Sequence, residues 1–507
     1  MPVVQQGQIN TTALIVPDVY VQIVPPQVSL LNGVPTNVLG IVGTATWGPV
    51  NAPTIVGNMA DYARQFGAIQ ARKYDAGTQV AAAVLQGANN MRVVRVTDGT
   101  DTAASGTLTA ASSSDASAIC AAINQGQSGL RGPSNFVVAS ATGSTVTLTS
   151  KYTGSMGNTI VGAIGAGSKA STSRVTVALP GQVPEVFDNI GAAAATVATA
   201  TLTGGTDGTT TISGSVLVGV DTVPRKGMYA LRNTGASVAF LADCDDSTTW
   251  STQVAYGLSE GTYMVGVGPS GDSIANAVSV KATAGIDSYA FKLLHGDWVY
   301  FNDTVNGSVR LISPQGFVAG LLANLSPEQS SLNKQLQGIV GTQKSYQNLT
   351  YSAAELQTLG QAGIDLITNP VPGGAYFGTR FGHNTSSNAV TNGDNYTRMT
   401  NYIAYTLNAG MGKFVGQLQS ATVRRNAAGT ISAFLQGMAQ QNMIGNAQGT
   451  VPYSVQINDA NNPPNRVALG YMQADVKVQY LSVIEKFLIN VEGGQSVQIA
   501  RQSTQLA

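Results

Sequence analysis

Short, continuously apolar segments separated by helix-like segments restrict the fold of this chain more than any other feature. The apolar segments are residues 228–231, 239–242, 263–267 and 290–294. Between them, apolar residues recur at helical spacing around residues 250–257 and 273–283. A strand that is apolar along its whole length is buried on both faces, as in a parallel sheet covered by helices. The pattern therefore predicts an α/β core.

The same alternation of strand-like and helix-like segments continues in both directions along the chain. Strand-like residues 39–43 and 91–96 flank an Ala-rich segment with helical periodicity at residues 74–90, which predicts a β-α-β unit. The Ser-Ala-Ala-Glu sequence at residues 352–355 is a capping box that starts a helix, and residues 364–367 follow as a strand. We therefore expect the α/β core to extend past residue 367.

Residues 99–205 have a different composition, dominated by Thr, Ser, Ala and Gly. Short β-like runs occur there at residues 136–138, 145–149 and 174–177. This change of texture predicts a β-sandwich domain inserted into the α/β core.

The C-terminal quarter combines helices with alternating strands. Apolar spacing predicts a long helix from residue 396 and a second helix around residues 430–443. Two alternating segments follow and are expected to pair as a hairpin; their apolar positions are Met472, Ala474, Val476, Val478 and Tyr480, and Phe487, Ile489 and Val491. Short β-rich segments also lie near the two ends, at residues 19–24 and 496–499. Because an isolated strand needs a partner, we expect strand donation between subunits.

Charge is scarce in this chain of 507 residues, which is long enough for roughly three or more domains. The 26 basic and 26 acidic residues cancel and make up 10% of the sequence, against about 25% in ordinary soluble domains. A nucleic-acid interface needs a basic field, and a membrane span needs about 20 consecutive apolar residues. The chain has neither a basic excess nor an apolar run of that length. We therefore expect no nucleic-acid partner and no direct membrane insertion. A weakly charged surface suits a subunit that buries much of it against copies of itself.

One segment matches a nucleotide-binding pattern. Residues 266–271 fit G-x-G-x-x-G, and Asp287 lies at a suitable distance for a ribose contact. Pro269 removes a backbone N–H from the loop that would face a pyrophosphate, so a plain turn is the favoured interpretation. No cofactor is expected.

Two further clusters could carry chemistry. Asp243, Asp245 and Asp246 follow a strand and could hold Mg²⁺ or Ca²⁺. The sequence contains no second acidic cluster to complete the coordination shell of such an ion. A helix cap by Asp245 or Asp246 is therefore the favoured interpretation. His295 and Asp297 could belong to a serine-hydrolase triad, but the chain contains no G-x-S-x-G segment. We therefore expect no metal, no catalytic residues and no enzyme.

Several short segments follow one another in a characteristic order. They are Val-Tyr-Val at 19–21, Val-Pro-Thr at 34–36, Gly-Ile-Val-Gly at 40–43, Trp-Gly-Pro at 47–49, Tyr-Thr-Gly-Ser-Met-Gly-Asn at 152–158, Gly-Gly-Thr-Asp-Gly at 204–208 and Asn-Asn-Pro-Pro at 461–464. In this order the chain resembles the tail sheath proteins of contractile-tailed bacteriophages over nearly its whole length.

The resemblance implies a structural subunit that polymerises helically around a tail tube. The polymer would contract from a metastable extended state and drive the tube through the host envelope. Its partners would be copies of itself, the tail tube protein, and the baseplate and tail terminator proteins. The subunit would assemble in the host bacterial cytoplasm and belong to the virion.

The resemblance also implies a division of the chain and roles for its parts. The α/β core would be subtilisin-like in shape without a working triad, the insert would face outward, and the C-terminal α+β domain would face the tube. The expected parts are an N-terminal arm (1–24), the first part of the core (25–98), the insert (99–205), the rest of the core (206–385), the C-terminal domain (386–493) and a C-terminal arm (494–507).

Individual residues can be assigned to these roles. Donated strands would contain Val19, Tyr20, Val21, Gln22, Ile23 and Val24 from one arm, and Ser496, Val497, Gln498 and Ile499 from the other. The acceptor sheet would contain Met472, Ala474, Val476, Val478, Tyr480, Phe487, Ile489 and Val491. Lys413, Arg424 and Arg425 form a small basic excess that is either a solvated helix end or a contact with the tube.

Three alternatives stay open at this point. A subtilisin-like hydrolase would share the core shape, and an adhesin or carbohydrate-binding protein would account for the Thr- and Ser-rich residues 99–205. A relative from a contractile secretion system or a bacteriocin particle would share the mechanism and differ only in its source.

Overall fold

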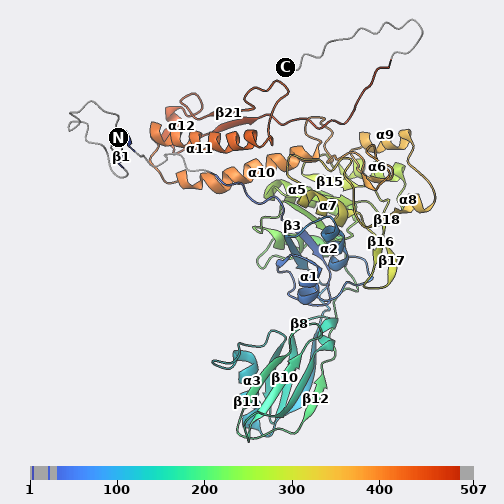
Figure 1. Cartoon of the computed structure of the whole chain (residues 1–507), viewed down its shortest axis with the longest axis vertical. Coiled ribbons are helices and arrows are strands. Elements are labelled where there is room, and N and C mark those ends of the chain that lie inside the picture. The colour runs from blue at the N-terminus through green and yellow to red at the C-terminus, as the bar shows by residue number, and fades with distance from the viewer. Residues whose placement is uncertain (1–2, 5–20, 23–30, 492–507) are drawn as a thin grey trace.

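The structure is a computed structural model that describes residues 3–4, 21–22 and 31–491. A β-rich unit lies at one end of the long axis, the α/β core lies in the middle, and the C-terminal helices lie at the other end (Figure 1). No helix within the described residues has the length and apolarity that a bilayer crossing requires.

A six-stranded sheet in the order β15-β14-β13-β3-β5-β4 forms the α/β core. Its strands are β3 (Leu39–Gly43), β4 (Thr54–Val56), β5 (Met91–Arg95), β13 (Val238–Leu241), β14 (Tyr263–Val267) and β15 (Phe291–Leu294). Every pair is parallel except β4 with β5. Strands β3, β13, β14 and β15 are buried at every residue, which explains why their sequences are apolar apart from Lys292 of β15. The predicted α/β class is confirmed.

Helices cover both faces of this sheet. One face packs against α1 (Met59–Phe66), α2 (Ala76–Leu85) and α7 (Gln315–Asn324). The other packs against α4 (Gly214–Val218), α5 (Trp250–Glu260), α6 (Ile274–Ala284) and α9 (Ala353–Gln361). Polar caps begin several of them: Asp75 caps α2, Ser273 caps α6, and Ser352 with Glu355 forms the predicted capping box of α9.

The predicted strand at residues 228–231 is wrong, because this segment is the 3₁₀ helix η3 (Gly227–Leu231). Gly227 has a φ of +59°, and a Cβ there would lie 2.5 Å from the carbonyl oxygen of Leu217. Met228 and Leu231, one 3₁₀ turn apart, are both buried in the core. Four apolar residues are too few to distinguish a strand from a helical turn by periodicity.

Residues 103–201 form two antiparallel sheets and one helix around a shared hydrophobic core. The elements are β6 (Ala103–Thr109), α3 (Ser113–Gln125), β7 (Val137–Thr142), β8 (Thr145–Thr153), η2 (Ser155–Thr159), β9 (Val161–Ala166), β10 (Ser173–Ala178), β11 (Glu185–Ile190) and β12 (Ala198–Thr201). The sheets have the orders β6-β8-β7 and β11-β10-β9-β12. The buried Arg95 ties this unit to the core, since its Nη1 donates to the carbonyls of Gly48 and Thr153.

The C-terminal region has a small core of its own, between two long helices and a two-stranded antiparallel sheet. Its elements are α10 (Asp394–Met411), η5 (Gly412–Phe414), α11 (Ala421–Gln440), β21 (Tyr453–Gln456), α12 (Pro464–Ala468) and β22 (Asp475–Val478). Helix α11 begins well before the predicted residue 430, because Ser420 caps it by accepting from the N–H of Val423.

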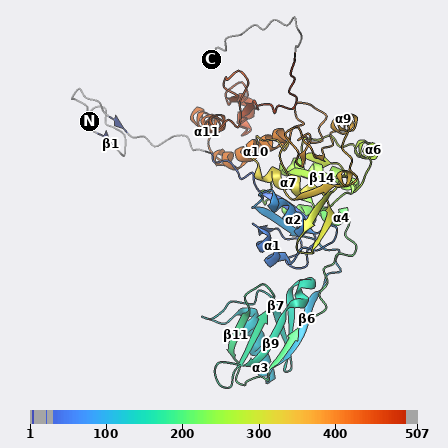
Figure 2. The ribbon, with the colours of Figure 1, turned by 45° about the vertical axis from the view of Figure 1, so that its right-hand side comes forward.

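Further short elements lie within and after the core. They are η4 (Ser247–Thr249), β16 (Val299–Asp303), β17 (Ser308–Ile312), β18 (Ile339–Thr342), α8 (Gln343–Tyr346), β19 (Ile367–Thr368) and β20 (Gly378–Thr379). Near the N-terminus, β1 (Val3–Val4) and β2 (Val21–Gln22) pair in parallel, and β1 lies apart from the body in Figure 2.

The predicted hairpin between residues 472–480 and 487–491 is wrong for this chain. Strand β22 pairs with β21 instead, with Tyr453 opposite Val478, and residues 479–491 contain no strand. Strand β21 places Tyr453 and Val455 against the cluster around α11, which stabilises that pairing. Alternation shows that a segment suits a half-buried sheet, but not which segment pairs with it.

Candidate subunit interface

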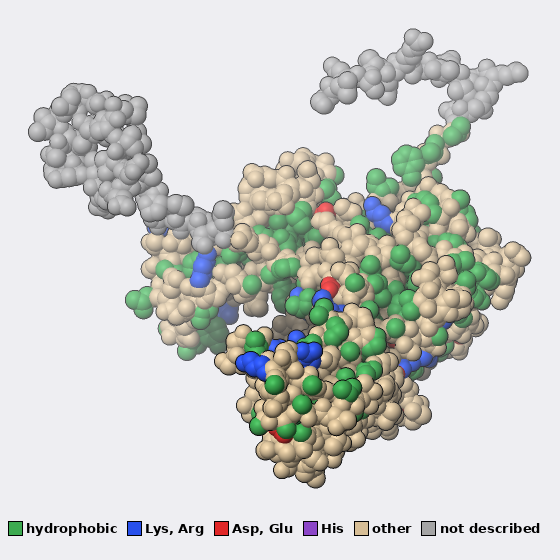
Figure 3. Space-filling view, turned by 60° about the horizontal axis from the view of Figure 1, so that its bottom comes forward, with side chains coloured by type: hydrophobic (Ala, Val, Ile, Leu, Met, Phe, Trp, Pro, Cys, Tyr) green, Lys and Arg blue, Asp and Glu red, His purple; other side chains and the backbone are tan. Residues whose placement is uncertain are grey.

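Large apolar side chains are exposed throughout the C-terminal region. They include Val415, Leu418, Val451, Leu469, Tyr471, Leu481, Ile484, Phe487, Leu488, Ile489 and Val491. Phe487, Leu488 and Val491 are 80%, 84% and 85% exposed. Hydrophobic side chains line the stretch of chain that leads into the grey C-terminal residues in Figure 3. Single exposed apolar residues are normal, but a contiguous run of them indicates an interaction surface.

The β21–β22 sheet precedes the exposed apolar residues 484–491 along the chain and has only two strands among the described residues. Each strand therefore keeps one edge of unpaired backbone N–H and C=O groups. Such an edge is a template for another strand, and a two-stranded sheet is marginally stable by itself. The geometry is that of a sheet that can accept strands from other chains.

The structure brings only part of the predicted acceptor set together. Val476 and Val478 lie in β22 and, with Tyr480, pack against the small C-terminal core. Met472, Ala474 and Val476 line an apolar groove of about 700 Å³ bounded by α10, η5 and α11. The remaining three residues, Phe487, Ile489 and Val491, lie outside any strand and are exposed.

The predicted donor strands fall mostly outside the described residues. Val21 and Gln22 form β2, whereas Val19, Tyr20, Ile23, Val24 and residues 496–499 are not described.

The predicted basic contact residues are not gathered into one patch. The Nη1 atom of Arg424 lies 2.6 Å from Asp459 Oδ1, so its charge is already paired at the surface. Lys413 lies over the ring of Phe414, with Nζ 5.3 Å from the centroid. Arg425 is exposed on α11. An exposed ion pair contributes little stability, so Arg424 remains exchangeable with another partner.

A buried ionic cluster attaches the C-terminal region to the core. The Nζ atom of Lys292 lies 2.6 Å from Asp365 Oδ2 and 3.1 Å from Asp394 Oδ1, and all three side chains are 0% exposed. Asp394 is the first residue of α10 and also accepts hydrogen bonds from the hydroxyls of Tyr263 and Ser331. A lysine inside the apolar run of β15 is the one sequence signal that could have indicated this cluster.

The cluster holds its charges through mutual compensation. Burial by itself would lower the pKa of Lys292, but Asp365 and Asp394 raise it above its ordinary value. Burial would raise the pKa of Asp394, but Lys292 and the hydrogen bonds lower it. Both groups are therefore charged at neutral pH, which makes the start of α10 a fixed attachment point.

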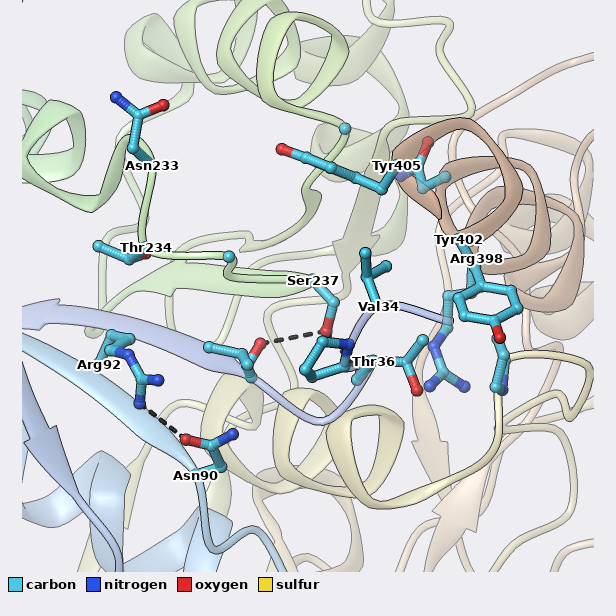
Figure 4. A pocket seen from close by; sticks show the side chains of 16 residues that line it. Val34, Thr36, Asn90, Arg92, Asn233, Thr234, Ser237, Arg398, Tyr402 and Tyr405 are labelled. Carbon is cyan, nitrogen blue, oxygen red and sulfur yellow. Dashed lines mark hydrogen bonds between the residues drawn. The ribbon is translucent and has the colours of Figure 1, made fainter. Parts of the chain in front are cut away.

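Beyond this attachment, α10 borders a cavity of about 360 Å³ next to the amino ends of the core strands. Figure 4 shows Arg398, Tyr402 and Tyr405 of α10 on one side of it and Asn90 and Arg92 on the other. The Nη1 atom of Arg92 donates to Asn90 Oδ1 at 2.7 Å. The helix is therefore anchored at its start by the ionic cluster. Along its middle, Arg398 donates to the carbonyls of Leu325 and Ser326, and Tyr405 donates to that of Glu260, beside the cavity.

The G-x-G-x-x-G loop is closed by the protein itself. The N–H of Gly268 donates to the carbonyl of Leu294, and the N–H of Gly271 donates to the carbonyl of Gly296. The Asp287 carboxylate accepts from the backbone and hydroxyl of Ser387. The groups that a dinucleotide would use are engaged, which supports the plain turn.

The acidic cluster is likewise engaged. Asp243 is buried and accepts from Gln79 Nε2 and from the N–H of Tyr74. Asp245 pairs with Lys73 at 2.8 Å, and Asp246 caps η4. The predicted helix cap is confirmed for Asp246. Within the described residues, no three or more His, Cys, Asp or Glu side chains are grouped as metal ligands.

No hydrogen bond joins His295 to Asp297 among the described residues. The Asp297 carboxylate accepts from the N–H of Lys344 and from the hydroxyl of Tyr351. The orienting interaction that a catalytic histidine needs is therefore not formed by this pair.

Comparison with known proteins identifies the fold. No family model and no curated protein matches the chain. The chain has the fold of the sheath proteins of contractile injection systems, in agreement with the resemblance noted from the sequence.

Three solved structures illustrate the likeness. The sheath complex of an extracellular contractile injection system, PVC, in the contracted state aligns with a TM-score of 0.55 and 11% identity over 96% of this chain and 99% of that chain. The sheath tail protein of Listeria innocua aligns with a TM-score of 0.57 and 14% identity over 86% of this chain and 90% of that chain. The sheath tail protein of Desulfitobacterium hafniense aligns with a TM-score of 0.55 and 15% identity over 87% of this chain and 93% of that chain.

Proposed function

We propose that this chain is the structural subunit of a contractile tail sheath. The observation that carries the proposal is the match of the fold to sheath proteins over most of both chains. Subunits would polymerise into a helical cylinder around a tail tube, as part of a virion assembled in a bacterial cytoplasm. Besides other copies, the tube, baseplate and terminator proteins would be its partners.

Strand exchange would connect neighbouring subunits. The open edges of the β21–β22 sheet and the exposed apolar run at residues 484–491 support this step. Donated strands from residues 19–24 and 496–499 would add to the sheet through main-chain hydrogen bonds. Because such bonds tolerate different side-chain neighbours, the connected sheets can persist while the larger bodies change their packing.

Contraction would then release a metastable packing without nucleotide hydrolysis. The β-rich unit, at the opposite end of the molecule from the C-terminal helices, would face outward (Figure 2). The C-terminal helices, with Lys413 and Arg425, would face the tube.

Electron microscopy of the purified protein tests this function. Negative staining is expected to show hollow, striated cylinders, formed alone or upon addition of the tube protein. Particles that stay monomeric under both conditions would contradict the proposal. Labelling by a serine-directed fluorophosphonate probe would favour the hydrolase alternative instead.

A further inference from the structure

A cavity of about 620 Å³ lies outside the carboxyl ends of β14 and β15. It is lined by the loop that leads into α6, by the turn after β15, and by α8 and α9 with the segment between them. Side chains that project charge or polarity into this region include Asp272, His295, Asp297, Tyr351 and Glu355. The carboxyl edge of a parallel sheet is where α/β folds place their ligands.

The imidazole of His295 lines this cavity and forms no hydrogen bond within the described part of the chain. The residue is 5% exposed, and its Nδ1 atom is buried with no partner among the described residues. Burial lowers the pKa of His295, so the ring is neutral at pH 7. A neutral imidazole carries one donor and one acceptor nitrogen. A buried group of this kind left unpaired costs free energy that a ligand can recover.

Asp272 offers a second unused acceptor. Its Oδ1 atom accepts from Asn276 Nδ2 at 2.8 Å, whereas its Oδ2 atom is buried without a partner among the described residues. A Cβ at Gly296 would lie 3.0 Å from the Cβ of Asp272 and 1.9 Å from the carbonyl oxygen of Pro269. Glycine at position 296 therefore permits the close approach that brings the Asp272 loop against the residue after His295.

The charges around the cavity favour a cation. Asp272, Asp297 and Glu355 contribute three carboxylates, and Lys344 contributes one ammonium group. Lys344 is already paired with Glu355 at 2.6 Å, and this contact with the Ser352 hydrogen bonds lowers the pKa of Glu355 to about 2. The lining therefore keeps two negative charges in excess. An anion would be repelled, and no three side chains are grouped here as metal ligands in the described part of the chain.

We propose that this cavity binds an organic cation, a guanidinium or ammonium group, held between the carboxylate of Asp272 and the imidazole of His295. Cationic donors form the strongest hydrogen bonds to carboxylates, and guanidinium can serve two acceptors at once. The group can come from a side chain of a second copy, which rests on the proposed function, or from a free small molecule.

Histidine NMR of the full-length protein tests the binding. The chain has two histidines, so ¹³C-labelled histidine gives one signal from the cavity and one, from His383, as an internal reference. The probe is N-acetyl-arginine amide, and the matched neutral control is N-acetyl-citrulline amide. We expect the arginine probe to shift the His295 signal and the citrulline probe to leave it unchanged. Equal shifts from both probes, or none from either, would overturn binding of a free cation.

Variants separate the two sources of the cation. Asp272→Asn should weaken binding of the arginine probe about tenfold or more, because a charged acceptor is lost. Asp459→Asn, which removes an exposed carboxylate elsewhere, should leave it unchanged. If Asp272→Asn also raises the critical concentration for polymerisation, a second copy supplies the cation; if polymerisation is unchanged while the probe binds, a free molecule does.

The outcomes also separate this inference from the proposed function. A wild-type protein that binds the probe but never polymerises would contradict the sheath proposal and keep the cation site. Normal cylinders from Asp272→Asn, together with no probe binding by the wild type, would overturn the cation site and keep the sheath proposal. The wild-type probe comparison stays decisive if Asp272→Asn fails to fold.

Discussion

The α/β core and the C-terminal region use apolar residues in opposite ways. In the core, four parallel strands are buried at every position and helices cover both faces. In the C-terminal region, a two-stranded sheet covers a small cluster, and residues 484–491 leave several large apolar side chains exposed. The burial of apolar side chains in the core is therefore complete within one chain, whereas the C-terminal region leaves exposed the kind of apolar surface that interaction sites have.

The largest expected effect comes from deleting residues 1–24. Polymerisation should be lost completely, because one donated strand is removed, while the free energy of unfolding stays within about 0.5 kcal/mol of the wild type. Sedimentation measures the first quantity, and urea denaturation followed by circular dichroism measures the second. Cylinders of normal appearance from the truncated chain would rule out donation of the N-terminal strand.

The second largest effect is expected from the substitution Lys292→Met in the core. It leaves Asp365 and Asp394 buried without their cation and should lower the free energy of unfolding by about 3–5 kcal/mol. Lys73→Met is the matched control, because it breaks a partly exposed pair with Asp245 and should cost at most about 1 kcal/mol. Equal losses in the two variants would show that the buried cluster is not the attachment described above.

The same cluster predicts the pH dependence of stability. The pKa of Asp394 is lowered from 3.8, so its contribution is present above pH 3.8 and is lost as pH falls through the lowered value. The pKa of Lys292 is raised from 10.5, so its contribution is present below pH 10.5 and is lost as pH rises through the raised value. Urea denaturation across pH should therefore show steeper acid and alkaline losses for the wild type than for Lys292→Met. Parallel profiles would disprove this assignment.

A smaller effect is expected from Phe487→Ser combined with Ile489→Ser. Both side chains are exposed in the single chain, so unfolding should change by at most about 0.5 kcal/mol. The critical concentration for polymerisation should rise about tenfold or more, because apolar area buried between subunits is lost. Val390→Ser, at an exposed position outside this run, is the control and should leave polymerisation unchanged. A double variant that polymerises like this control would exclude residues 484–491 from the interface.

The smallest effect concerns a core helix. Ser352→Ala removes the capping box of α9 and should lower the free energy of unfolding by about 1 kcal/mol without changing polymerisation. Ser279→Ala, at an exposed position within α6, should change it by at most about 0.5 kcal/mol. A polymerisation defect in Ser352→Ala would mean that the core is less independent of assembly than its burial indicates.

Sequence reasoning located one strand of the candidate interface. The alternation of residues 472–480 predicts a strand, and β22 lies within this segment. Its role as an acceptor stays a prediction. Residues 487–491, predicted as the second strand of a hairpin, form no strand and are exposed, so their place in an acceptor sheet stays a prediction. The sequence does not predict the buried ionic cluster, because an isolated lysine in an apolar run gives no information about the acidic residues that Lys292 contacts.

Local patterns in the sequence determined the parallel strands, the capped helices and the change of texture at residue 99, because periodicity and capping depend on residues a few positions apart. Tertiary structure alone decided that β22 pairs with β21, that residues 227–231 form a 3₁₀ turn, and that Lys292 meets Asp365 and Asp394. Those ion pairs join residues 73 and 102 positions apart. Contacts at such separations depend on how whole elements pack, and no local periodicity encodes that packing.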